Sequence, residues 1–327
     1  MRIAVTGSIA TDHLMVFPGR FTDQLIDGEL ERVSLSFLAD RLEIRHGGVG
    51  ANIAFGLGRL GTRPILVGAA GLDFAEYGSR LREAGVDTEA VRVSESLHTA
   101  RFVCTTDTDQ NQIATFYAGA MAEAVRINLE DAHWRTGGLD LVLIGADDPQ
   151  AMLRHTASAH GLGIPVAADP SQQLARLSGD QTRALVEGAT WLFTNAYEAA
   201  LLQERTGWSE ADVLARVSTW IVTRGADGIS LLSRDVPRRD IPAVTTDAAA
   251  DPTGVGDAFR AGFLAGLARR LPPERAAQLG CALATVALES VGTQEYKLLA
   301  TDLLARIDRV YGSTAARDIE PCLAGVS

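Results

Sequence analysis

Short apolar runs that alternate with helical stretches dominate the second half of the chain. After residue 120 the segments LDLVLIGA, IPVAADP, TWLFTN and TWIVTRG follow one another, mostly with helical stretches between them. Strands that are apolar throughout and alternate with helices are typical of a parallel sheet covered on both faces. Ile3–Thr6 predicts a further strand of this kind, and Ala300–Tyr311 predicts a helix. The pattern therefore predicts an α/β fold with a mostly parallel, doubly covered central sheet.

Two polar segments, 12–45 and 98–120, interrupt this pattern. Residues 99–117 predict two strands around a polar turn, and a hairpin centred on Asp109 without a bulge would place Phe102 opposite Phe116. Strands inserted between core elements commonly form a lid over a ligand site. We therefore expect an α/β core of residues 1–11, 46–97 and 121–327, with a small β-rich lid of residues 12–45 and 98–120.

Composition and charge narrow the range of partners. The 327 residues are 46% hydrophobic and 22% charged, a mixture that can bury a sizeable core, and the formal net charge is −11. An acidic chain without a long apolar run disfavours nucleic acid and membranes as partners. Three widely separated cysteines disfavour a disulfide framework, and the N-terminal run predicts a strand rather than a signal peptide. We expect a cytoplasmic protein, in which backbone amides could still hold a small anion.

The segment Asp251–Phe263, DPTGVGDAFRAGF, carries the clearest chemistry. Gly254 and Gly256 precede a predicted helix, so that consecutive N–H groups and the helix dipole would form an anion site. Such a site needs no lysine, and Lys297 is the only lysine of the chain, which excludes a Walker A loop. Asp257 beside the anion site suits a general base for a hydroxyl that attacks a phosphoryl group. Taken alone, Asp257 is more often a residue that caps the helix after a glycine turn.

The whole segment resembles the C-terminal signature of the PfkB family, the ribokinase-like kinases of sugars and nucleosides. A second signature of that family is matched by GGVGANIA from Gly47, and a VGxxGxD element is matched from Val67 to Asp73. The Asn-x-x-Glu element is matched by Asn195 and Glu198, and a nucleotide-loop element by residues 222–228. The resemblance covers essentially the whole chain, and it implies a ribokinase-like fold and transfer of a phosphoryl group from ATP to an alcohol.

The resemblance also implies roles for individual residues on the ATP side. Asp257 matches the catalytic base, and the anion hole is matched by Gly254, Val255 and Gly256. Asn195 and Glu198 match residues that organise the phosphates and Mg²⁺, Glu198 through water, although the pair alone is typical of a helix cap. The loop along the ATP is matched by Thr223, Arg224, Gly225 and Gly228.

On the acceptor side the resemblance extends to bacterial adenosine kinases of the actinobacterial type. It implies that Asp12 binds the sugar hydroxyls with Gly48 and Asn52, and that Ser8 and Ser36 add contacts. Phe102 and Phe116 would flank the adenine, with Gln172 and Gln173 near the nucleoside; paired aromatic residues are otherwise typical of a small lid core or a dimer contact. The implied reaction is ATP-dependent phosphorylation of the adenosine 5′-hydroxyl, giving AMP and ADP.

Related kinases suggest two further features. Several of them bind K⁺ beside the anion hole, which here would involve Asp251 and the loop Ser290–Gln294. The lid would also form the contact of a homodimer. The lid segment Thr105–Gln112 contains no arginine, and nothing assigns a catalytic role to nearby Arg101.

Three other functions remain open from the sequence. Within the kinases, the acceptor could be a sugar, as in ribokinase or fructokinase. Gly56–Gly61 has the spacing GxGxxG of NAD(P)-dependent oxidoreductases, but it lies at the end of a predicted helix instead of between a strand and a helix, which favours helix packing. A nucleoside-binding module without activity would not need Asp257.

Overall fold

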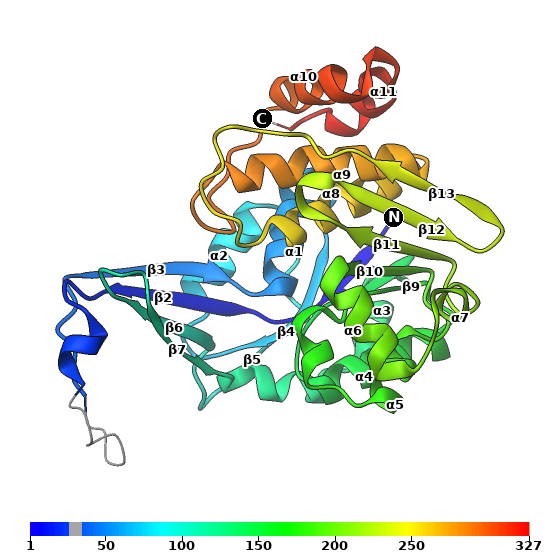
Figure 1. Ribbon diagram of the computed structural model, residues 1–327. Helices are drawn as coiled ribbons and strands as arrows, with labels where there is room; N and C mark the ends of the chain where they lie inside the picture. Colours follow the sequence, from blue (N-terminus) through cyan, green and yellow to red (C-terminus); the bar gives the residue numbers. More distant parts are fainter. Residues whose placement is uncertain (26–34, 327) are drawn as a thin grey trace.

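The computed structural model describes residues 1–25 and 35–326, so that part of the predicted lid, residues 26–34, lies outside the described residues. Within the described chain two sheets of different size are present, and the small sheet projects from one side of the α/β core (Figure 1). The small sheet has the order β3 (Arg41–Gly47), β2 (Ala10–Val16), β6 (Ala100–Thr106) and β7 (Gln112–Tyr117). The lid therefore begins at Ala10 and returns to the core at Gly47, two residues beyond each predicted boundary.

The large sheet contains nine strands in the described residues. Their order is β13 (Val236–Ile241), β12 (Ile229–Ser233), β11 (Thr219–Thr223), β10 (Trp191–Asn195), β9 (Val166–Ala168), β8 (Leu141–Ile144), β1 (Ile3–Thr6), β4 (Ile65–Ala70) and β5 (Val91–Val93). The strands from β11 to β5 are parallel, whereas β12 and β13 form an antiparallel edge. The predicted parallel sheet is confirmed, and the two antiparallel strands add to it.

Helices cover both faces of the large sheet because successive residues of each buried strand point to opposite sides. In β1, Ile3 and Val5 pack into one apolar cluster and Ala4 packs into the other. The first cluster is covered by α1 (Val49–Arg59), α2 (Ala75–Glu83), α8 (Val255–Ala268), α9 (Pro273–Leu288), α10 (Ala300–Tyr311) and α11 (Ser313–Ile319). The second is covered by α3 (Leu129–Arg135), α4 (Pro149–Gly161), α5 (Gly179–Val186), α6 (Ala196–Thr206) and α7 (Glu210–Leu214).

The register of the small sheet confirms the predicted hairpin. Phe102 of β6 lies directly opposite Phe116 of β7, and the pairing runs without a bulge from Arg101–Tyr117 to Thr106–Gln112. Asp12 of β2 is the neighbour of Phe102 on one side and of Arg45 in β3 on the other. One row across the sheet therefore carries Arg45, Asp12, Phe102 and Phe116, and these side chains share one face.

The GxGxxG spacing of residues 56–61 belongs to helix packing. Gly56 lies within α1, where a Cβ atom would stand 2.6 Å from the Cβ of Ala261 in α8. This close approach brings the start of α1 and the start of α8 together. No dinucleotide-binding turn is formed there, since the glycines lie in the second half of α1 and just beyond its end.

Cys104, Cys281 and Cys322 are all free and buried. In the described part of the chain, no helix combines the length and the apolar character needed to cross a membrane.

Candidate active site

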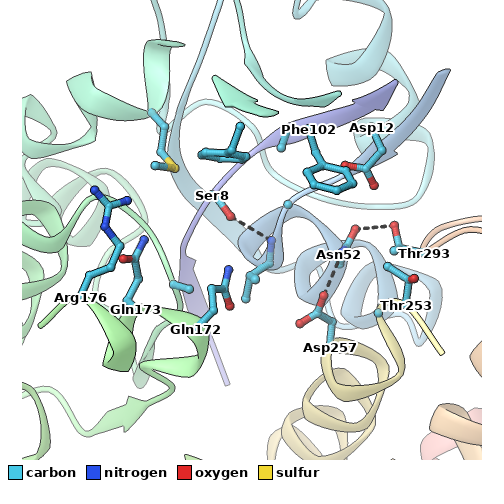
Figure 2. Close-up of a pocket in the computed structure, with 17 residues that line it drawn as sticks. Ser8, Asp12, Asn52, Phe102, Gln172, Gln173, Arg176, Thr253, Asp257 and Thr293 are labelled. Carbon is cyan, nitrogen blue, oxygen red and sulfur yellow. Dashed lines mark hydrogen bonds between the residues drawn. The ribbon is translucent and has the colours of Figure 1, made fainter. Parts of the chain in front are cut away.

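A first cavity of about 360 Å³ lies between the small sheet and the core, and we call it the lid-side pocket (Figure 2). It is lined by residues of both parts of the molecule: Ser8, Ala10, Asp12, Gly48, Val49, Asn52, Phe102, Phe116, Met121, Ala146, Gln172, Gln173, Arg176, Thr253, Gly254, Asp257 and Thr293. Of the residues predicted for the acceptor, Ser36 alone is absent from this lining: it is exposed on the surface.

A second cavity of about 380 Å³, the core-side pocket, lies on the other side of the α8 N-terminus. Its lining is mostly apolar: Thr223, Gly225, Ala226, Gly228, Ile229, Ala243, Val244, Thr245, Thr246, Pro252, Val255, Gly256, Phe259, Cys281, Ala284, Thr285 and Leu288. Three of the predicted ATP residues, Thr223, Gly225 and Gly228, belong to it. Arg224 does not, because its guanidinium is 3.0 Å from the carboxylate of Asp240.

The first turn of α8 forms the wall between the two pockets. Gly254 lines the lid-side pocket, whereas Val255 and Gly256 line the core-side pocket. Gly254 has φ 75°, and a Cβ atom there would stand 2.8 Å from the side chain of Thr293, so a residue with a side chain would be strained and crowded. Of the amides at Gly254–Gly256, that of Val255 has a long contact of 3.4 Å with the carbonyl of Pro252, and these amides can face an anion placed at the junction of the pockets.

Asp257 lies on the same turn and faces the lid-side pocket. Partial removal from water raises its pKa to about 7, while a hydrogen bond from Asn52 and the charge of Arg260 act in the opposite direction. Asn52 Nδ2 donates to Asp257 Oδ2 over 2.8 Å. A carboxylate with a pKa near neutrality is well matched to accepting a proton from an alcohol.

Asn52 is itself fixed by the loop that follows α9. Its Oδ1 accepts hydrogen bonds from Thr293 Oγ1 over 2.9 Å and from Gln294 Nε2 over 2.8 Å. Both bonds are buried, and together they leave the amide nitrogen of Asn52 free to donate to Asp257. The orientation of Asp257 therefore depends on three separate segments of the chain.

Asp12 stands opposite Asp257 across the lid-side pocket. Figure 2 shows Asp12 and Phe102 on the lid side and Asp257 on the core side. Burial raises the pKa of Asp12, and the charge of Arg45 opposes this rise. Gly48, with φ 95°, brings the chain so close that a Cβ atom would stand 2.5 Å from the carbonyl oxygen of Ser8. Ser8 Oγ in turn accepts a hydrogen bond from the amide of Val49 over 3.0 Å.

Asn195 and Glu198 form a helix cap at the start of α6. Asn195 Oδ1 accepts a hydrogen bond from the amide of Glu198 over 2.8 Å, and Glu198 Oε2 accepts one from the amide of Asn195 over 2.7 Å. Neither residue lines the two pockets. The carboxylate of Glu198 is nevertheless close enough to raise the pKa of Asp257 and of Asp169.

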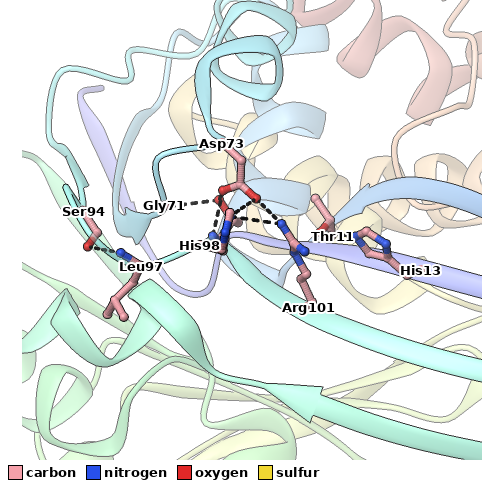
Figure 3. A network of polar contacts seen from close by, with 9 residues as sticks. Thr11, His13, Gly71, Asp73, Ser94, Leu97, His98 and Arg101 are labelled. Carbon is pink, nitrogen blue, oxygen red and sulfur yellow. Dashed lines mark hydrogen bonds and ion pairs between the residues drawn. The ribbon is translucent and has the colours of Figure 1, made fainter.

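A polar network holds the chain where it enters β6 (Figure 3). Asp73 Oδ1 accepts hydrogen bonds from the amide and the hydroxyl of Thr99, at 2.8 and 2.7 Å. Asp73 Oδ2 is 2.6 Å from Arg101 Nη2. The last residue of the VGxxGxD element therefore ties the lid to the core, and Arg101 is bound there rather than in a pocket.

Asp251 organises the loop after α9. Its Oδ2 accepts a hydrogen bond from the amide of Gly292 over 3.0 Å, and its Oδ1 accepts one from the amide of Thr253 over 2.9 Å. Arg45 Nη1 is 3.6 Å from the same carboxylate. Asp251 and the loop Ser290–Gln294 are thus in contact, as the resemblance implied.

Several lining residues were not predicted from the sequence. In the lid-side pocket they include Arg176, Thr253 and Thr293, which come from three different loops. In the core-side pocket the missed residues include one face of α9, formed by Cys281, Ala284, Thr285 and Leu288. Their spacing of three and four residues indicates an apolar helix face, but an ordinary core helix has the same pattern.

Comparisons with known proteins agree with this geometry. Residues 6–299 match the family model described as pfkB family carbohydrate kinase. The nucleoside kinase of Methanocaldococcus jannaschii is 30% identical over 251 residues, covering 76% of this chain and 81% of that protein. The nucleoside kinase of Methanothermobacter thermautotrophicus is 31% identical over 279 residues, covering 81% of this chain and 85% of that protein.

A solved structure extends the likeness to the fold. The structure of Burkholderia thailandensis nucleoside kinase in complex with inosine has 34% sequence identity and a TM-score of 0.82, covering 95% of this chain and 98% of that one. The α/β core and the small sheet therefore have the ribokinase-like arrangement. Because the family model spans most of the chain and carries both signatures with it, the protein belongs to the pfkB family of carbohydrate kinases.

Proposed function

We propose that this protein is a nucleoside kinase that transfers the γ-phosphoryl group of ATP to the 5′-hydroxyl of adenosine, giving AMP and ADP. The observation that supports it is the wall shared by the two pockets. At the start of α8, Gly254 and Asp257 line the lid-side pocket, whereas Val255 and Gly256 line the core-side pocket. An acceptor in one pocket and ATP in the other would meet at that turn.

The residues at this junction have complementary tasks in the proposed reaction. Asp257 takes the proton of the 5′-hydroxyl on its carboxylate, which makes the oxygen a better nucleophile. The backbone amides of Gly254–Gly256 donate to the oxygens of the transferring phosphoryl group, where negative charge is spread in the transition state. Asp12 binds the vicinal hydroxyls of ribose, and the rings of Phe102 and Phe116 hold the base by stacking.

The choice of adenosine rests on the base end of the lid-side pocket. Gln172 is exposed to the pocket, and a glutamine amide matches the N6/N7 edge of adenine with one acceptor and one donor. Arg176 also lines the pocket, and a guanidinium matches the O6/N7 edge of a 6-oxopurine. Inosine is therefore the second candidate, and a relative of this chain has been solved with inosine bound.

The site fits Mg²⁺ as the companion of ATP. In the described residues no group of three or more histidine, cysteine, aspartate or glutamate side chains is poised to hold a metal. Mg²⁺ bound mainly through phosphates and water needs no such group. Glu198 lies within electrostatic range of Asp257 and would hold the ion through water. When bound, Mg²⁺ neutralises charge on the phosphates, while the chain itself supplies the base and the amides.

The proposal includes K⁺ beside Asp251. That carboxylate already anchors Gly292, so a cation there would order the loop that contacts Gly254 through Thr293. Activity in chloride salts of K⁺, Na⁺ and tetramethylammonium at matched ionic strength tests this part. A higher kcat in K⁺ with similar KM values supports it, and equal rates after removal of K⁺ contradict it.

We also propose that the outer face of the small sheet binds a second copy of the chain. This face is opposite to the row with Asp12 and Phe102, and it exposes the large apolar side chains Leu42, Ile44, Ile113 and Tyr117. A dimer would cover them. The three free, buried cysteines and the use of ATP suit a reducing cytoplasm.

A panel of acceptors tests the proposed function. Adenosine, inosine, guanosine, ribose and fructose are compared with Mg·ATP in a coupled assay of ADP release, with the variant Asp257→Asn as background. Adenosine should give the highest kcat/KM. Preference for ribose or fructose would indicate a sugar kinase, preference for inosine would indicate recognition by Arg176, and ADP release from none would indicate a binding module.

A further inference from the structure

A buried ion pair lies beneath the first turn of α8. Arg260, one turn after Gly256, faces Asp169, which follows β9 in the core sheet. Arg260 Nε is 2.5 Å from Asp169 Oδ2, and Arg260 Nη2 donates a hydrogen bond to Asp169 Oδ1 over 2.7 Å. Both side chains are buried, with 5% and 1% of their surface exposed. The Nη2 hydrogen bond and the close ionic contact of Nε with Oδ2, which is not itself a hydrogen bond, hold the guanidinium against the carboxylate.

The third nitrogen of this guanidinium reaches the anion hole. Arg260 Nη1 donates to the carbonyl oxygen of Gly256 over 3.0 Å. A Cβ atom on Gly256 would stand 2.9 Å from that nitrogen, so the guanidinium occupies the space that a side chain at position 256 would need. The backbone of the turn that separates the two pockets is therefore tied to the core sheet through Arg260.

The pair also determines the charge around Asp257. Arg260 approaches from α8, Asp169 from the end of β9 and Glu198 from α6. Asn52 of α1 donates a hydrogen bond, and the hydroxyl of Tyr296 lies close enough to have its own pKa raised by Asp257. Of these groups Arg260 is the cation, and it opposes the two carboxylates.

Stability alone does not account for such a pair. Removing two charges from water is costly, and well-packed apolar residues are often as stable or more stable in their place. A charged pair kept beneath a catalytic turn therefore points to a task in the reaction.

We propose that Arg260, anchored by Asp169, is a positioning residue for phosphoryl transfer. It holds the Gly256 carbonyl so that the amides of Gly254–Gly256 meet the transferring group in one fixed orientation, and it keeps positive charge next to Asp257. This inference rests on the proposed phosphoryl transfer at α8. Arg260 itself would touch neither substrate.

Four variants test the inference: Arg260→Met, Arg260→Lys, Asp169→Asn and the double variant Arg260→Met/Asp169→Asn. The double variant leaves no unpaired buried charge, which protects the fold. In the double variant kcat should fall by about tenfold or more, because a misplacement of catalytic groups by about 1 Å can cost about 10²-fold. The KM values for ATP and nucleoside should change much less.

The pH profile separates positioning from a merely structural role. In Arg260→Met, loss of the charge should move the acid limb of kcat upward by roughly one pH unit, the low end of what a neighbouring opposite charge contributes. In the double variant the opposite effects of Arg260 and Asp169 should largely cancel, so that kcat is its readout. Arg260→Lys keeps the charge but loses the fork, so it should lower kcat while the acid limb stays nearly in place. Asp169→Asn keeps the cation and removes an opposing carboxylate, so its acid limb should move downward.

Arg306→Met is the matched control. Arg306 pairs with Glu289 through two hydrogen bonds of 2.8 Å, and neither side chain lines a pocket. A folded double variant with the wild-type kcat, or Arg260→Met with the wild-type acid limb, would overturn the inference. A second result would also overturn it: Arg260→Met lowers kcat and Tm without moving the acid limb, and Arg306→Met lowers kcat equally. Wild-type protein without activity on any acceptor would instead refute the proposed function.

Discussion

Asn52 joins three segments that are far apart in the sequence. It belongs to the GGVGANIA signature, donates to Asp257 of the C-terminal signature, and accepts from Thr293 and Gln294 in the loop after α9. A single amide thereby sets the direction in which Asp257 presents its carboxylate. The two family signatures are adjacent in space, and each supplies one partner of the hydrogen bond between Asn52 and Asp257.

Asp257→Asn tests the base directly. The amide keeps the shape of the side chain, so the fold and ATP binding should remain. The variant cannot take the proton of the acceptor, and kcat should fall by about 10² or more. Turnover and ATP affinity, the latter by calorimetry, are the measurements. Near-normal kcat would remove Asp257 from the mechanism.

As the proposed base, Asp257, whose pKa is raised to about 7 by burial, should give the reaction an acid limb. The carboxylate is the active form, and it is lost as pH falls through 7. With Mg·ATP saturating, kcat/KM for the nucleoside should be level above about pH 8 and approach a tenfold fall per unit below about pH 6. A profile that stays level down to pH 5 would show that Asp257 does not titrate near neutrality.

At this scale the sequence predicts motif residues better than their partners. Asp257, Asn52 and Asp12 could be predicted as site residues because each lies in a recognisable segment, and all three line the lid-side pocket. Thr293 bonds to Asn52 across 241 positions, a separation that no local pattern reveals. Arg224 sits in the predicted loop but turns to Asp240 on β13, a strand that was not predicted.

Among the elements, the small sheet presents its ligand residues as a row. Arg45, Asp12, Phe102 and Phe116 lie on adjacent strands at one level, so a polar group and two rings stand side by side. This order matches a ligand with hydroxyls at one end and a flat base at the other. The hairpin register could be predicted because its strands are joined by a short turn, whereas the pairing of β2 with β6 is not local.

Phe102→Ala and Phe116→Ala test the row. Stacking is worth roughly 1–3 kcal/mol per base, so either change should raise KM for the nucleoside about fivefold or more, while KM for ATP stays the same. Thr115→Ala on the opposite face of β7 is the matched control. Normal nucleoside binding combined with altered assembly would identify the rings as an interface instead.

For the whole molecule, the outer face of the small sheet is the surface that we propose binds a second copy of the chain. Ile44 and Ile113 are 59% and 47% exposed, on strands whose other face carries ligand residues. A four-stranded sheet covered on one side only leaves this apolar surface in water. The proposed second copy would bury it and support the lid at the same time.

Ile44→Asp should therefore produce monomers, because a charge at the centre of an apolar interface must be removed from water. Light scattering after size-exclusion chromatography gives the mass, and kcat/KM for the nucleoside reports on the lid. Val236→Asp on the edge strand β13, where the side chain is 60% exposed, is the control. An unchanged mass, or a wild-type protein that is already monomeric, contradicts the proposed dimer.

The alternation of faces in the small sheet has a practical meaning for protein engineering. Every second residue of β2, β6 and β7 lies on the face that carries Asp12 and Phe102, and the residues between them lie on the outer face, toward the proposed partner. A mutant library confined to the inward positions should change the range of accepted nucleosides and leave assembly intact. The positions on this face are 10, 12, 14, 16, 100, 102, 104, 106, 112, 114 and 116, and of these Ala10, Asp12, Phe102 and Phe116 line the lid-side pocket. Deletion of one residue from β6 would exchange the two sets, so variants of altered length should lose both properties together.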